Sequence, residues 1–283
     1  MSASAVVPTG IHRWGGYVAF VVLFAIACGL LSWWQWARRD EAIARVDVIT
    51  SNYDAEAVPL DQLLPEPGDS DPTVEWHPVT LVGEYMTDEL LLVRSRPHDG
   101  QPGFEQLIPF RLADGRVIAV DRGWLPVSDD ALLPASNPAP PEGDVEVVVR
   151  LRVGEPVLPG RGAPEGQLAT INLPQVAEAL EGVIAPERVD TGMYGLLVSE
   201  NPLPIDARPA PAIKPDVDEG PHASYALQWI MFALVAVTGL VWAYRRERRI
   251  AALPANEQAA ARRERRQGRD EDEEDALIDA ASR

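Results

Sequence analysis

Two long segments without a charged side chain constrain this sequence more than any other feature. Residues 14–37 and 223–244 contain no Asp, Glu, Lys or Arg. About 20 apolar residues at a rise of 1.5 Å each cross a hydrocarbon core about 30 Å thick. Both segments therefore predict transmembrane helices. The polar stretch between them is long enough for one compact domain with its own core.

The first segment has an alternative interpretation as a cleaved signal peptide. It continues into Trp33, Trp34 and Trp36, where a signal peptide would have a cleavage site of small residues. A retained helix is therefore favoured. Its Cys28 is the one cysteine of the chain and is interpreted as a small packing residue.

The positive charges near the helix ends predict the orientation in the membrane. Four arginines follow the second segment directly (Arg245, Arg246, Arg248 and Arg249). Because basic residues concentrate on the cytoplasmic side, we predict cytoplasmic termini at 1–13 and 245–283, with an acidic run at 270–275 in the tail. The spans are then 14–37 and 222–244, and residues 38–221 form an extracytoplasmic domain. Arg38 and Arg39 lie on the outer side against this rule and require a specific role.

The charge of the middle domain excludes one class of partner. Residues 40–222 contain 33 acidic and 12 basic residues, a net charge of −21. Binding to phosphate backbones needs a positive field, so the domain is not expected to bind nucleic acid. It contains no cysteine, so no disulfide holds it together.

The middle domain is predicted to be mostly antiparallel β structure, which makes the chain an α+β membrane protein. The first span is expected to continue as an amphipathic stem through Ile43, Val46, Ile49 and Tyr53. Asn172 is a predicted cap for a helix that ends at Gly182, and the loops at 59–72, 134–141 and 202–221 are expected to be extended connectors without a fold. Strands are predicted at 79–85 (with a bulge at Gly83), 90–95, 104–112, 116–122, 145–153 and 194–200.

Catalytic motifs are scarce in this sequence. It contains no Gly-rich phosphate loop, no pair of cysteines for zinc and no His-x-x-x-His. Of the four histidines, His12, His77 and His98 are interpreted as surface residues. His222 stands out because it is placed at the outer end of the second helix.

If that helix begins near Pro221, which suits a first helical position, His222, Tyr225 and Trp229 fall on one face. Two interpretations remain open. The residues form an aromatic belt at the membrane interface, or they form a ligand site, since a neutral imidazole is a good axial ligand for haem iron. Gln228 lies beside this face.

The end of the first helix carries a matching cluster. Trp34 and Arg38 are one turn apart, with Gln35 between their faces. Arg38 either contacts a carboxylate, such as a haem propionate or an acidic neighbour, or extends its charged end to water.

Four motifs together resemble a known family. They are Trp-Gln-x-x-Arg (Trp34, Gln35, Arg38), Gly-x-Tyr (Gly83, Tyr85), Arg-Gly-Trp-x-Pro (122–126) and His-x-x-Tyr-Ala-x-Gln-Trp (222–229). In this order, around one outer domain, residues 14–244 resemble a bacterial member of the surfeit-locus family. Ser32 departs from the usual Gly of the family. Glu219, Gly220 and Pro221 stand where an Asn pair is often found.

The resemblance implies a non-enzymatic assembly factor for haem–copper cytochrome c oxidase in the bacterial cell membrane. Its partners would be oxidase subunit I, other oxidase or supercomplex subunits, and the lipid bilayer. It implies that His222 ligates haem a, with Tyr225, Gln228, Trp229, Trp34, Gln35 and Arg38 shaping the site. In Arg-Gly-Trp-x-Pro we expect Gly123 to allow a turn and Pro126 to end a strand. The alternatives are a permanently bound accessory subunit of the oxidase or supercomplex and, with little support, a membrane-tethered enzyme.

Overall fold

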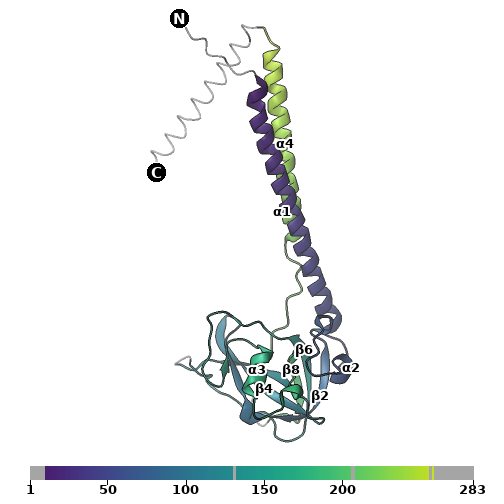
Figure 1. Ribbon diagram of the computed structural model, residues 1–283, viewed down its shortest axis with the longest axis vertical. Helices are drawn as coiled ribbons and strands as arrows, with labels where there is room; N and C mark the ends of the chain where they lie inside the picture. The colour runs from purple at the N-terminus through teal and green to yellow at the C-terminus, as the bar shows by residue number, and fades with distance from the viewer. Residues whose placement is uncertain (1–9, 130–131, 205–207, 255–256, 258–283) are drawn as a thin grey trace. The chain divides into compact units, whose positions relative to one another are not determined.

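The computed structural model describes residues 10–129, 132–204, 208–254 and 257 (Figure 1). Contacts divide the chain into two compact units. One consists of the segments up to Glu41 and from Glu219, and the other is Ala42–Asp218. The predicted acidic run at 270–275 lies outside the described residues.

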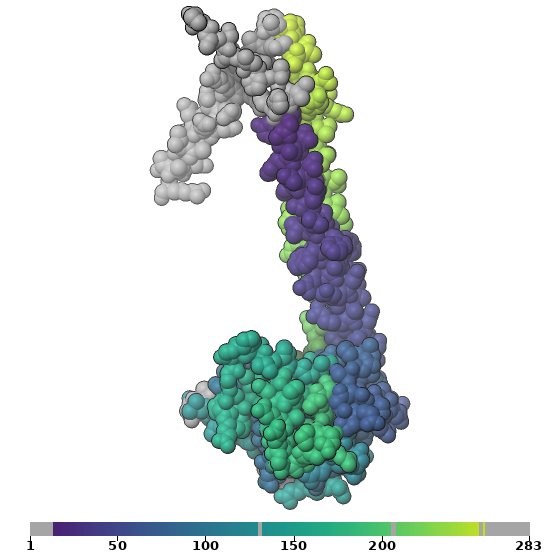
Figure 2. All heavy atoms as spheres, in the orientation of Figure 1, coloured from purple at the N-terminus to yellow at the C-terminus, as the bar shows by residue number. Residues whose placement is uncertain are grey.

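Two long helices make up the first unit. Helix α1 spans Gly10–Asn52 and α4 spans His222–Ala251, and Figures 1 and 2 both show them side by side. Their most apolar windows are only 11% and 6% buried, whereas the core helix of a soluble protein is mostly buried. So much exposed apolar surface requires a non-aqueous surrounding, so the chain is a membrane protein with two candidate spanning helices.

The two helices meet along one narrow seam. On α1 the partly or fully buried positions include 21, 25, 28, 32, 35 and 39, and on α4 they include 222, 226, 229, 233, 236 and 240. This alternation of three and four residues is the spacing of helices that pack at a shallow angle. The middle of the seam is lined by small side chains, which let membrane helices approach closely. Cys28 is 1% exposed within it, as expected for a packing residue.

Five strands of the second unit close into a barrel. They are β2 (Pro78–Tyr85), β6 (Val145–Val153), β8 (Met193–Asn201), β5 (Val117–Pro126) and β4 (Gln101–Leu112). Each pairs with the next in this order, and β4 pairs again with β2. The β5–β8 pairing is parallel and the other four are antiparallel. The sheet is therefore mixed: the four antiparallel pairings form one continuous run from β5 through β4, β2 and β6 to β8, and the parallel β5–β8 pair closes it.

Shorter elements extend the barrel. Strand β3 (Leu91–His98) pairs with β4 and with β7 (Gln167–Leu168), and β1 (Val58–Pro59) pairs with β2. Helix α3 (Leu173–Ala179) has the predicted cap, because the Asn172 side chain accepts a hydrogen bond from the Gln175 amide. Single 3-10 turns lie at Pro72–Val74, Thr87–Glu89 and Pro186–Arg188.

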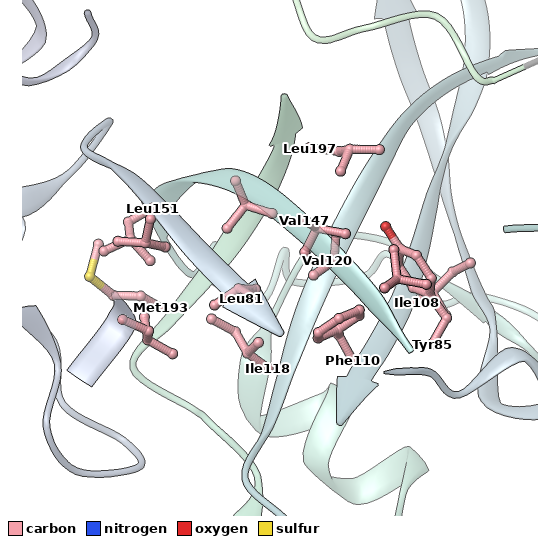
Figure 3. Packing of buried hydrophobic residues seen from close by; sticks show 14 of the residues in the cluster. Leu81, Tyr85, Ile108, Phe110, Ile118, Val120, Val147, Leu151, Met193 and Leu197 are labelled. Carbon is pink, nitrogen blue, oxygen red and sulfur yellow. The ribbon is translucent and has the colours of Figure 1, made fainter. Parts of the chain in front are cut away.

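One cluster of buried apolar residues fills the barrel interior, and a second packs on its outer face. The interior cluster contains Leu81, Ile108, Phe110, Ile118 and Val147, whose side chains gather between the strands in Figure 3. The outer cluster lies between the barrel and α3, and it includes Val117, Ala119 and Tyr194. The end of α1 packs on this outer cluster through Val48 and Ile49, followed by Tyr53. The predicted stem is therefore helical to Asn52.

Several local predictions were wrong for identifiable reasons. The loop at 59–72 contains helix α2 (Leu60–Leu63), because Leu60 and Leu64 fill the barrel interior. Strand β2 has no bulge at Gly83 in its pairing with β6. At Gly83 β2 also begins its pairing with β4, and a Cβ there would lie 1.9 Å from the Arg111 carbonyl oxygen. His98, interpreted as a surface residue, is only partly exposed, since it ends β3 and its ring stacks on that of Trp124 with the centres 5.0 Å apart.

The strands predicted at 104–112 and 116–122 are confirmed, and they pair with one another as antiparallel β4 and β5. Strand β5 ends at Pro126, as expected. Gly123, however, makes no turn. It lies inside β5 with φ of 130°, and a Cβ would lie 2.3 Å from the Ala210 carbonyl oxygen. Glycine is required there because a second backbone segment approaches the strand.

The charged guanidinium of Arg122 lies in the barrel interior. Its side chain and that of Glu200 are fully buried, and they form an ion pair at 3.0 Å between Nη2 and Oε1. Arg122 also donates from Nη1 to Gln106 Oε1 at 2.6 Å, and the Tyr85 hydroxyl donates to Glu200 Oε2 at 3.0 Å. One network thus joins β5, β8, β4 and β2, and it links the Arg-Gly-Trp and Gly-x-Tyr motifs.

Replacing Glu200 with Gln should destabilise the second unit strongly. The change leaves Arg122 as an uncompensated buried charge, which costs about 3–5 kcal/mol. Thermal melting of the full-length protein in detergent, followed by near-ultraviolet circular dichroism, measures this effect. Glu84→Gln is the matched control, because Glu84 pairs with Arg111 on the surface and should cost at most about 1 kcal/mol. Equal melting temperatures for the two variants would show that the buried pair does not stabilise the barrel.

Candidate functional site on the helix pair

Helix α4 begins at His222, which is where the predicted second span begins. Pro221 is the N-cap residue, and its carbonyl accepts a hydrogen bond from the Tyr225 amide at 3.1 Å. Its fixed φ suits this entry into the helix. The His222 ring is thereby presented at the very start of α4, on the seam with α1.

Three polar contacts follow one another along the seam. Ser32 Oγ donates to the Ala226 carbonyl at 3.0 Å, His222 Nδ1 lies 3.0 Å from Gln35 Oε1, and Arg39 Nη2 donates to Glu219 Oε2 at 3.0 Å. Successive contacts are one turn apart on α1 and run in the opposite direction along α4. The two helices are therefore antiparallel, and these contacts fix their register.

The contact with Gln35 defines the state of the His222 ring. With Oε1 of the amide facing the ring, Nδ1–H donates to it, and in the neutral form of this tautomer the lone pair is on Nε2. Gly220 has no side chain that could cover Nε2. A Cβ at that position would lie 3.4 Å from Nε2. Glycine thus leaves space beside the one nitrogen of the ring that is free to accept.

The other predicted site residues lie outside the seam. Trp34 and Tyr225 are about half exposed, at 50% and 48%. Arg38 lies 5.9 Å from the Trp34 ring centre and pairs with Glu41 at 2.8 Å, both at the surface. Gln228 is exposed and Trp229 is partly buried. The structure therefore brings Gln35 to His222, and it places Trp34, Arg38, Tyr225 and Gln228 on exposed faces.

The sequence interpretation missed three residues of this seam. It selected Arg38, but Arg39 is the arginine that pairs with Glu219, three residues before the start of α4. It treated Ser32 and Glu219 only as departures from a motif, yet both make contacts between the helices. The signal was available, since 32, 35 and 39 are spaced by three and four residues and share one helix face.

Most of this chain is similar in sequence to known proteins. A sequence model of the SURF1 family matches residues 22–234. An uncharacterized SURF1-like protein of Mycobacterium tuberculosis is 33% identical over 232 residues, which cover 80% of this chain and 82% of the relative. Its counterpart in Mycobacterium bovis gives the same values. A SURF1-like protein of Rickettsia felis is 23% identical over 224 residues, covering 77% and 89% of the two chains.

The register of the seam predicts which cysteine pair will oxidise. In a Cys28→Ala background, Ser32→Cys with Ala226→Cys should form a disulfide, because these residues touch and are 5% and 0% exposed. Trp33→Cys with Ala226→Cys is the control and should stay reduced, since Trp33 is 72% exposed and faces away. Loss of maleimide labelling after mild oxidation measures the bond. Similar oxidation of both pairs would contradict the described register.

Proposed function

Because the chain belongs to the SURF1 family, which is linked to cytochrome oxidase assembly and is not a catalytic family, we propose a specific role for it. It binds haem a at His222 in the cell membrane and aids insertion of this haem into subunit I of a haem–copper oxidase. The observation that carries the proposal is the hydrogen bond between His222 and Gln35.

That hydrogen bond prepares His222 as a ligand. Metal-binding histidines commonly donate their second ring N–H to an oxygen, which fixes the tautomer and makes the free nitrogen more basic. Gln35 supplies this oxygen to Nδ1, and Gly220 leaves the space beside Nε2 open. These residues fit haem, whose iron takes an imidazole nitrogen as axial ligand.

The exposed faces beside His222 suit the rest of a haem. Trp34 and Tyr225 offer aromatic surface at the same end of the helix pair, with Trp229 and Gln228 one turn deeper. Arg38 is exposed and paired only with Glu41 through an i,i+3 contact. Such a surface pair is worth at most about 1 kcal/mol, so a propionate can displace Glu41.

The orientation of the chain is part of the proposal. Arg248 and Arg249 lie in the last turn of α4, and Arg245 and Arg246 precede them. Four arginines at one end of a span favour a cytoplasmic location for that end. The His222 end of the helix pair then lies at the outer membrane surface, and the barrel unit is extracytoplasmic.

Cysteine labelling tests this orientation. In a Cys28→Ala background, a membrane-impermeant maleimide should label Glu165→Cys in intact cells, because that exposed residue belongs to the barrel unit. It should label Ala252→Cys, just beyond α4, only after lysis. The reverse pattern would show that the chain is inserted the other way round.

Spectra of the full-length protein test the role of His222. Protein purified in detergent from cells that make haem a should carry the haem, and His222→Ala should lose it. Gln35→Leu should weaken binding about 10- to 100-fold, as outer-shell partners of metal ligands typically do. His77→Ala is the control, because His77 lies in the barrel unit with Nδ1 2.9 Å from the Pro78 carbonyl.

Two outcomes of this experiment would contradict the proposal. If His222→Ala inserts normally and keeps wild-type haem a content, His222 is an interfacial residue rather than a ligand. If the wild-type protein lacks haem a and purifies with mature oxidase at one copy each, it is a permanent accessory subunit. The extensive exposed apolar surface of α1 and α4 would then be where oxidase helices pack.

A further inference from the structure

A small polar cavity of about 200 Å³ lies on the outer face of the barrel. Its walls include Glu105 from β4, Asp121 and Trp124 from β5, and Tyr194 from β8, with Glu155 from the loop after β6. Ligand pockets for larger molecules usually enclose about 300–1,000 Å³. This cavity therefore suits a group the size of a single side chain.

A β-bulge creates the cavity wall. Glu105 is opposite Trp124 and Leu107 is opposite Asp121, so Arg122 and Gly123 together face the single residue between them on β4. Bulges redirect side chains and occur often beside functional sites. Here the bulge lets Asp121 and Trp124 both line the cavity while Arg122 enters the barrel interior.

The charges around the cavity do not balance. Arg96 donates to both Glu105 and Glu155, and Arg152 donates to Glu75 at 2.7 Å. Asp121 is 3% exposed and accepts a hydrogen bond from the Gly123 amide at 2.9 Å. Among the described residues it has no ion-pair partner. One buried carboxyl group is thus left without an ion-pair partner of its own within the described ranges.

The Tyr194 hydroxyl is a second group left unused. Tyr194 is 3% exposed, and its hydroxyl makes no hydrogen bond within the described ranges. Burial raises its pKa against the opposing effect of Arg152, and the charges of Asp121, Glu105 and Glu155 raise it further. The hydroxyl is therefore neutral and lies near the same carboxylates. The hydroxyl lines the cavity and has no hydrogen-bond partner among the described residues, so it is available to a bound group.

We propose that this cavity binds an ammonium or guanidinium group at the end of a lysine or arginine side chain of a partner protein. Such a group supplies the positive charge that Asp121 lacks and donates a hydrogen bond to the Tyr194 hydroxyl. The net charge of −21 over residues 40–222 draws cationic partners toward the unit. A metal ion is a poorer fit, because the described residues contain no group of three His, Cys, Asp or Glu that could hold one.

Nuclear magnetic resonance with small probes tests the proposal on the full-length protein in detergent. Saturation transfer should detect N-acetyl-lysine methylamide and N-acetyl-arginine methylamide, but not the neutral N-acetyl-norleucine methylamide. Asp121→Asn should weaken the binding at least tenfold. Glu146→Gln is the matched control, since it removes one negative charge at an exposed position of the same unit and should leave binding unchanged.

Three outcomes would overturn the assignment. Equal binding of the norleucine probe would show that the positive charge is not recognised. If Asp121→Asn and Glu146→Gln weaken probe binding equally, the overall negative charge of the unit, and not this cavity, explains the binding. Binding of butylamine without binding of either amino-acid probe would identify a free amine, rather than a protein side chain, as the ligand.

The stability of Asp121→Asn provides an independent readout. Burial, and then the charge of Glu105, raise the pKa of Asp121 well above its usual value. The folded state therefore holds this proton at pH values where the unfolded chain releases it, and stability falls as pH rises above about 3.9. Asp121→Asn should raise the melting temperature at pH 7 and change it little at pH 3. An unchanged or lower value at pH 7 would show that Asp121 is already compensated.

Discussion

The guanidinium of Arg122 is a full charge inside a closed barrel, and the arrangement of four strands depends on neutralising it. Glu200 from β8 provides the opposite charge, while Gln106 from β4 and Tyr85 from β2 complete the hydrogen bonds. Buried ion pairs contribute little net stability but are very costly to break. The network therefore selects one pairing of these strands, because any other would bury an isolated charge.

The same stretch of β5 also shapes the outer face of the barrel. In a regular strand, Asp121 and Trp124 would point to opposite faces, since side chains alternate. The extra residue of the bulge turns both toward the cavity, and Gly123 makes room for the backbone at Ala210. The Arg-Gly-Trp segment is thus a structural element on its inner side. On its outer side it presents the carboxyl group of Asp121, which has no ion-pair partner in the part of the chain that the structure describes.

Local patterns predicted the parts of this fold that local physics determines. Both long helices, the main strands and the Asn172 cap follow from hydropathy, β-branched runs and capping chemistry. The closure of the barrel did not, because it depends on a parallel β5–β8 pairing between distant segments. Gln35 and His222 were each selected, but their contact depends on the helix register. The spacing of residues 32, 35 and 39 places Arg39, and not Arg38, on the face of Gln35. The partner of Arg39 on the other segment, Glu219, follows only from the register.

The ion pair between Arg39 and Glu219 has a consequence for the unfolded chain. These residues flank the barrel unit, so packing of α1 on α4 brings the two ends of a segment of nearly 180 residues together. If the helices stay paired while the barrel unfolds, the unfolded segment is a closed loop with fewer conformations. A covalent cross-link over such a length lowers the entropy of the unfolded state, which stabilises the folded state by about 5 kcal/mol at 25 °C. In a unit without a single cysteine, the helix pair takes the place of a disulfide.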